Sequence, residues 1–88
     1  MHYAINKEHV ASRELDGGTV LIHYDTGFYY SLNGTATFLW TLLSEREMTF
    51  DELAVELARE YARDREDVLA DLRRHLEELA AENLLVAR

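Results

Sequence analysis

The stretch Gly27-Phe28-Tyr29-Tyr30-Ser31-Leu32, "GFYYSL", decides how the fold is read, because the pattern of apolar residues changes on either side of it. Before it, β-branched and aromatic residues are interrupted by the turn signals Asp16–Gly18 and Asp25–Gly27. After it, apolar residues recur at helical spacing. The stretch is therefore predicted to be the last strand before a run of helices.

The residues that precede the helices predict a three-stranded antiparallel sheet. Residues 9–15 alternate weakly, residues 19–24 are rich in β-branched and aromatic types, and residues 28–31 form the third strand. The turns between them are short, so sequential strands are expected to pair as an antiparallel meander. Gly27 is expected in the left-handed position of the second turn.

The rest of the chain predicts three helices, each with a start signal. Asn33 is a suitable N-cap for the first, Thr49 and Glu52 have the spacing of a capping box for the second, and Asp64 is expected to cap the third. The last six residues are expected as a short strand or a docked tail. We therefore predict one α+β domain over residues 1–88, winged helix-turn-helix-like, with a three-stranded antiparallel sheet followed by three helices (βββααα).

Composition and charge exclude several classes of partner. The chain has 88 residues, nine basic and 17 acidic, and a net charge of −8, so nucleic acid and anionic membranes are repelled. No cysteine is present, which excludes thiolate metal centres and disulfides and fits a cytoplasmic protein. No apolar run is long enough for a signal peptide or a membrane span.

The sequence contains no pattern typical of an enzyme. Its four histidines lack ligand-like spacing, and no HExxH, P-loop or GxSxG motif is present. The carboxylates fall mostly on predicted helix faces and caps, which is typical of a solvated surface. We expect a non-enzyme with no metal and no cofactor.

The third strand has an unusual edge for a soluble domain. The first strand carries Arg13 and Glu14, which protect an edge from unwanted pairing, but residues 28–31 carry no charge. Phe28 and Tyr30 are expected to point into the core and Tyr29 to lie at the surface. The backbone of this strand needs hydrogen-bond partners, so either a helix covers the edge or an extended peptide adds to it.

Three segments in order, "TGFYYSLNGTATFLW", "TFDELAVELAREY" and "DREDVLADLRRHLEELAAENLL", resemble the PqqD family. Members of that family are recognition elements for precursors of ribosomally synthesised and post-translationally modified peptides (RiPPs). The chain departs from the family pattern at Gly34, where many members carry proline, and at Glu82-Asn83, where many carry a basic residue and glycine. The matching positions are Tyr30, Leu32, Asn33, Gly34, Thr35, Trp40, Glu52, Leu53, Leu57, Val68, Leu72, Leu76, Leu84 and Leu85.

The resemblance implies that the protein binds the leader segment of a precursor peptide and presents it to a separate leader peptidase or radical-SAM maturase. It also implies that the leader adds antiparallel to strand 28–31, in a groove beside the third helix. A free-standing domain of this size resembles both the recognition proteins of lasso-peptide clusters and the stand-alone partners of radical-SAM maturases. The stretch "YYSLNGTATFLW" favours the lasso type.

On this interpretation the third strand supplies backbone hydrogen bonds and the third helix supplies a pocket wall. Val68, Leu72 and His75 are expected near the boundary with the strand, with Leu69 facing the core. Arg73 is expected either to pair with acidic leader residues or to lie on a solvated face beside acidic neighbours. The predicted leader-binding residues are Phe28, Tyr29, Tyr30, Ser31, Leu32, Val68, Leu72, Arg73 and His75.

Two alternatives use the same fold. A winged-helix DNA-binding regulator would use the third helix, but residues 64–82 hold three arginines against seven acidic residues, a net of three minus seven, or −4. That charge opposes contact with a phosphate backbone. A protein–protein adaptor or a homodimer through the same strand edge stays open, so we expect a monomer or a weak dimer.

Overall fold

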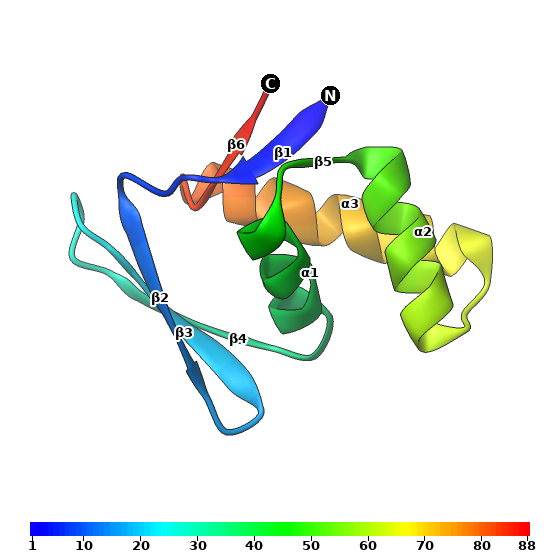
Figure 1. The fold of residues 1–88 in the computed structure, drawn as a ribbon, viewed down its shortest axis with the longest axis horizontal. Helices are drawn as coiled ribbons and strands as arrows, with labels where there is room; N and C mark the ends of the chain where they lie inside the picture. Colours follow the sequence, from blue (N-terminus) through cyan, green and yellow to red (C-terminus); the bar gives the residue numbers. More distant parts are fainter.

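The computed structural model describes residues 1–88, apart from the side chain of Asn33. The α+β class is confirmed, with three helices and two small antiparallel sheets (Figure 1). In chain order the elements are β1 (His2–Ile5), β2 (Val10–Leu15), β3 (Gly18–His23), β4 (Tyr29–Asn33), α1 (Gly34–Glu45), β5 (Met48–Thr49), α2 (Phe50–Tyr61), α3 (Arg65–Ala81) and β6 (Leu85–Ala87).

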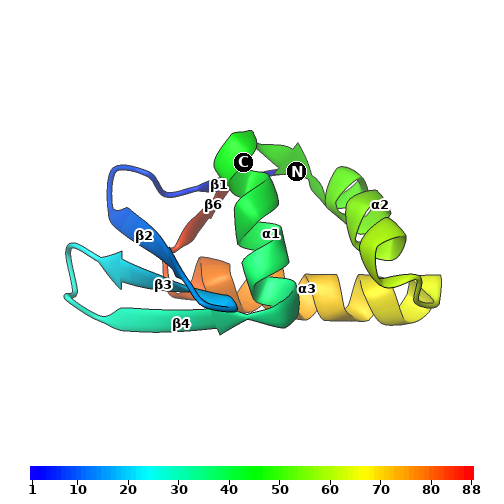
Figure 2. The same cartoon turned by 60° about the horizontal axis from the view of Figure 1, so that its bottom comes forward.

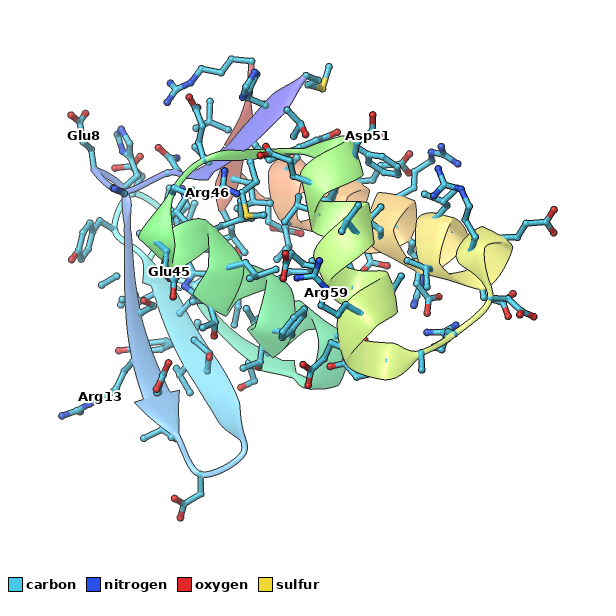
Figure 3. All side chains as sticks on the ribbon, turned by 45° about the vertical axis from the view of Figure 1, so that its right-hand side comes forward. Glu8, Arg13, Glu45, Arg46, Asp51 and Arg59 are labelled. Carbon is cyan, nitrogen blue, oxygen red and sulfur yellow. The ribbon has the colours of Figure 1, made fainter. Side chains whose placement is uncertain are left out.

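The predicted meander is present as the sheet β2-β3-β4, and both of its pairings are antiparallel. Leu21 of β3 lies opposite Tyr30 of β4. Gly27 has a φ of +74°, as expected for a glycine in the left-handed position of a hairpin turn. On the outer strand, Arg13 extends from β2 into solvent (Figure 3), where a charged side chain protects the edge of the sheet.

The second sheet, in the order β5-β1-β6, was not predicted. It joins three distant parts of the chain, because Tyr3 lies opposite both Met48 and Ala87. Beyond the paired strands, the His2 amide donates to the Arg88 carbonyl (2.6 Å) and the Arg88 amide donates to the His2 carbonyl (2.8 Å). The two ends of the chain therefore lie side by side (Figure 1).

The core is built mainly from leucines of all three helices and β3. Leu21, Leu39, Leu53 and Leu72 are fully buried. In Figures 1 and 2, α1 stands between the β2-β3-β4 sheet and α2, so its two sides face different parts of the molecule. Because α1 begins directly after β4, the end of that strand is fixed to the core.

The helix caps agree with the sequence in part. The Thr49 hydroxyl accepts a hydrogen bond from the Glu52 amide (3.1 Å), and the Glu52 carboxylate accepts one from the Thr49 amide (2.9 Å), so the predicted capping box is confirmed. Asp64 occupies the N-cap position of α3, but its side chain makes no capping bond. The predicted capping role of Asn33 falls on a side chain outside the described residues.

Replacing Thr49 with alanine removes one half of the capping box. We expect Thr49→Ala to lower the free energy of unfolding by about 1 kcal/mol, measured by urea denaturation followed by circular dichroism. Thr41→Ala is the matched control, because the Thr41 hydroxyl only donates to the Thr37 carbonyl within α1. Equal losses in the two variants would contradict a specific contribution from the capping box.

Candidate peptide-binding groove

One edge of β4 is open. β4 pairs with β3 on one side, and in the part of the chain that the structure describes no strand pairs with its other side. Figure 2 shows β4 along the bottom of the sheet, running toward the start of α3. The backbone groups on that edge therefore depend on water or on a bound partner for their hydrogen bonds.

The hydrogen bonds at the turn determine which backbone groups face the open edge. The His23 amide donates to the Phe28 carbonyl (3.0 Å), and the Gly27 amide donates to the His23 carbonyl (2.8 Å). With Gly27 at a positive φ, this is the pattern of a glycine bulge. The Phe28 amide donates to the Thr26 hydroxyl (3.2 Å), so both backbone groups of Phe28 already have partners.

Antiparallel strands alternate between hydrogen-bonded and non-hydrogen-bonded pairs. His23 and Phe28 form a hydrogen-bonded pair, so every second residue of β4 after Phe28 belongs to such a pair as well. The backbone groups of Tyr30 and Leu32 therefore point to β3. Those of Tyr29 and Ser31 point to the open edge. Of the predicted edge residues 28–31, only Tyr29 and Ser31 therefore have amide and carbonyl groups that a partner strand could bind.

The side chains of β4 alternate as predicted, with one exception. Tyr30 and Leu32 are half-buried against the core, and Tyr29 is 72% exposed. Phe28 was expected in the core but is 62% exposed, so that prediction is wrong. Phe28 directly follows the turn of the β3–β4 hairpin, and this end of the hairpin extends beyond the helices (Figure 1).

A groove of about 600 Å³ lies between β4 and the last turns of α3. The Tyr30 hydroxyl donates to a Glu82 carboxylate oxygen (3.0 Å), so a hydrogen bond joins the two walls. Burial raises the pKa of Tyr30 above its ordinary value, and the bond to Glu82 and its charge add to the effect. The lining residues are Tyr29, Tyr30, Ser31, Leu32, Glu78, Leu79, Ala81, Glu82 and Leu84.

Two predicted pocket residues of α3 lie in the core instead. Val68 is 1% exposed and Leu72 is 0% exposed, so the prediction that they lie at the boundary with the strand is wrong. Leu69, which was expected in the core, is half-buried. The apolar stripe of α3 is thus centred on Val68 and Leu72, and the side of the helix that faces β4 is not the one predicted.

The other two predicted α3 residues lie on different flanks of the helix. The Arg73 guanidinium lies 5.5 Å from the centre of the Phe50 ring on α2. Glu82 follows Arg73 by nine residues, and at about 100° per residue this separation places the two side chains on opposite sides of α3. His75 is half-buried and lies about two turns before Glu82 on the same side, outside the residues that line the groove.

The α3 wall of the groove was not predicted from the sequence; it is formed by Glu78, Leu79, Ala81 and Glu82. One signal was available: Glu78 and Glu82 are one helical turn apart and both border the apolar stripe. Choosing between that border and the opposite one, however, requires knowing where β4 crosses α3. This crossing is set by tertiary packing.

Neither a metal-binding cluster nor a membrane-spanning helix occurs in the part of the chain that the structure describes. The described residues contain no group of three or more His, Cys, Asp or Glu side chains that could hold a metal ion. His9 pairs with Asp25 (2.8 Å), but this pair is exposed and lies outside the groove. Over the same residues, no helix is both long enough and apolar enough to cross a membrane.

Comparison with known proteins identifies the family. Residues 18–85 match the family model described as coenzyme PQQ synthesis protein D (PqqD). The chain belongs to the PqqD family. Members of this family are non-catalytic peptide-binding proteins, which confirms the expectation that the protein is not an enzyme. A comparison with curated proteins gave no significant match.

Two solved structures share the fold. TbiB1 in complex with the TbiA(beta) leader peptide superposes with a TM-score of 0.87 and 34% sequence identity, covering 97% of this chain and 96% of that chain. Lasso peptide synthetase B1 complexed with the leader peptide superposes with a TM-score of 0.79 and 23% identity, covering 97% and 98%. The second likeness concerns the fold alone.

The Tyr30–Glu82 hydrogen bond has a spectroscopic consequence. The folded protein favours the protonated phenol of Tyr30, so its stability falls as the pH rises past the ordinary tyrosine pKa. In an ultraviolet titration at 295 nm, we expect Tyr30→Phe to remove a component that ionises above the ordinary pKa of tyrosine. Tyr29→Phe, at a mostly exposed ring, is the control and should leave that late component in place. Identical curves for the two variants would contradict this assignment.

Proposed function

We propose that this protein binds the leader segment of a ribosomally synthesised precursor peptide as a fourth strand of the β2-β3-β4 sheet. It then delivers that peptide to a separate processing enzyme, a leader peptidase or a maturase. The observation that carries the proposal is the open edge of β4 beside a groove walled by α3. Membership of the PqqD family and the likeness to TbiB1, which was solved with a leader peptide, support it.

The edge geometry specifies how such a strand would bind. An antiparallel leader would exchange hydrogen bonds with the amide and carbonyl groups of Tyr29 and Ser31. The leader residue opposite Tyr30 would then lie on the same face as the Tyr30 ring, inside the groove. Its two neighbours would point to the opposite face of the sheet. Successive leader side chains would therefore alternate between the groove and the outer face.

Delivery needs a surface that stays free while the leader is bound. The outer face of the sheet provides one, with a hollow of about 330 Å³ that Leu15, Val20, Ile22 and Tyr29 help to line. Leu15 is 56% exposed, and an exposed apolar surface of this kind is typical of protein contacts. We propose that the processing enzyme docks on this face. We propose a lasso-peptide pathway, which the stretch "YYSLNGTATFLW" favours.

Proline at position 31 tests strand addition directly. The Ser31 amide points to the open edge, so Ser31→Pro removes a donor to the leader without breaking a bond to β3. We expect the affinity for a labelled leader, from the precursor gene beside this one, to fall by about tenfold or more in fluorescence polarisation. Ser31→Ala, which keeps the amide, should bind like the wild type.

Two results would contradict the proposal. One is a folded wild type that binds neither this leader nor a panel of leaders from the main RiPP classes. The other is equal binding by Ser31→Pro and Ser31→Ala, with circular dichroism showing both folded. Sedimentation without peptide tests the homodimer alternative, because a dimer through β4 would dissociate in Ser31→Pro.

A further inference from the structure

The two walls of the groove differ in charge. The β4 wall, residues 29–32, is uncharged, whereas the α3 wall carries the carboxylates of Glu78 and Glu82. Among the described residues, neither carboxylate lies within 4.0 Å of a Lys, Arg or His nitrogen. The Tyr30 hydroxyl satisfies one oxygen of Glu82 but leaves its charge uncompensated.

The nearest positive groups on α3 do not neutralise this wall. Arg74 pairs with Asp71 (3.4 Å), one turn earlier. His75 is close enough to Glu78 for the two to interact, but burial and the charge of Arg74 lower the pKa of His75 below its ordinary value. The imidazole is therefore mostly neutral at pH 7. Arg73 lies on the other flank of the helix, against Phe50.

We propose that this groove selects leader peptides with a lysine or arginine at one or both of the positions that lie opposite Tyr30 and Leu32. The inference rests on the proposed function and specifies which leaders the site prefers. A bound strand would cover the α3 wall and remove water from Glu78 and Glu82. Covering an unpaired carboxylate with an uncharged peptide is unfavourable, while a facing cation compensates for the lost hydration.

The repeat distances of helix and strand fit two such contacts. β4 runs toward the start of α3 (Figure 2), so moving from Tyr30 to Leu32 corresponds to moving from Glu82 back to Glu78. Four residues along a helix, the separation of Glu78 and Glu82, advance about 6 Å, and two strand residues advance about 6.7 Å. The leader residue opposite Tyr30 would thus meet Glu82, and the one opposite Leu32 would meet Glu78.

The chain offers a matched control for charge. Glu66 and Glu77 are exposed residues of the same helix and lie outside the groove. Glu66→Gln/Glu77→Gln therefore changes the net charge by as much as Glu78→Gln/Glu82→Gln does. Long-range attraction of a basic peptide by the acidic protein falls equally in the two double variants. Only a local contact in the groove distinguishes them.

The test is fluorescence polarisation with the same labelled leader and with leaders in which each lysine or arginine is replaced in turn by glutamine. We expect Glu78→Gln/Glu82→Gln to weaken binding of the unmodified leader about tenfold, and the control pair to change it less than twofold. One or two of the leader replacements should lose as much affinity as the groove variant. For those peptides, the affinity of Glu78→Gln/Glu82→Gln should be close to that of the wild type.

Charge reversal gives a gain of affinity that loss of folding cannot imitate. Glu78→Lys/Glu82→Lys should bind a leader with glutamate at the critical positions more tightly than the wild type binds it. If the groove and control variants bind alike while Ser31→Pro still weakens binding, the charge selection is wrong and strand addition stands. If the folded wild type binds no leader at all, the proposed function fails with it.

Discussion

The constraint on which the site depends is the set of unpaired backbone groups on the open edge of β4. The fold keeps this edge accessible. α1 anchors one end of the strand, and the glycine bulge at Gly27 determines which backbone groups face outward from the other end. α3 lies beside the edge without covering it, and its side chains form the other wall of the groove. A peptide that binds here gains hydrogen bonds from an edge that is already ordered, so the ordering cost falls on the peptide.

The sequence predicted the elements whose signals are local. The β2-β3-β4 meander follows from short turns and β-branched residues, and the capping box of α2 follows from Thr49 and Glu52. β1 and β5 were missed because four and two residues are too short for a periodic pattern, and their pairing joins distant parts of the chain. The absence of charge on residues 28–31 is also visible in the sequence, but it left open whether a helix covers this edge or a peptide adds to it.

The α3 side of the site was predicted poorly for a physical reason. Helical periodicity shows that Val68, Leu72 and Leu76 share one face, but it does not show which border of that face meets β4. The structure assigns the border with Glu78 and Glu82, two turns beyond the residues expected. Gly34 departs from the family pattern, in which many members carry proline, and its φ of +53° is a conformation that proline cannot adopt.

The hydrogen bonds between His2 and Arg88 bring the two ends of the fold to one place. A short linker across them would convert the β1–β6 pairing, which has the greatest sequence separation in the structure, into a local hairpin and reduce its loop-closure entropy. The topology therefore suits circular permutation, with new ends in the exposed turn between β2 and β3, at Asp16 and Gly17. It also suits insertion of the whole domain into a surface loop of another protein, because both ends would leave from one point.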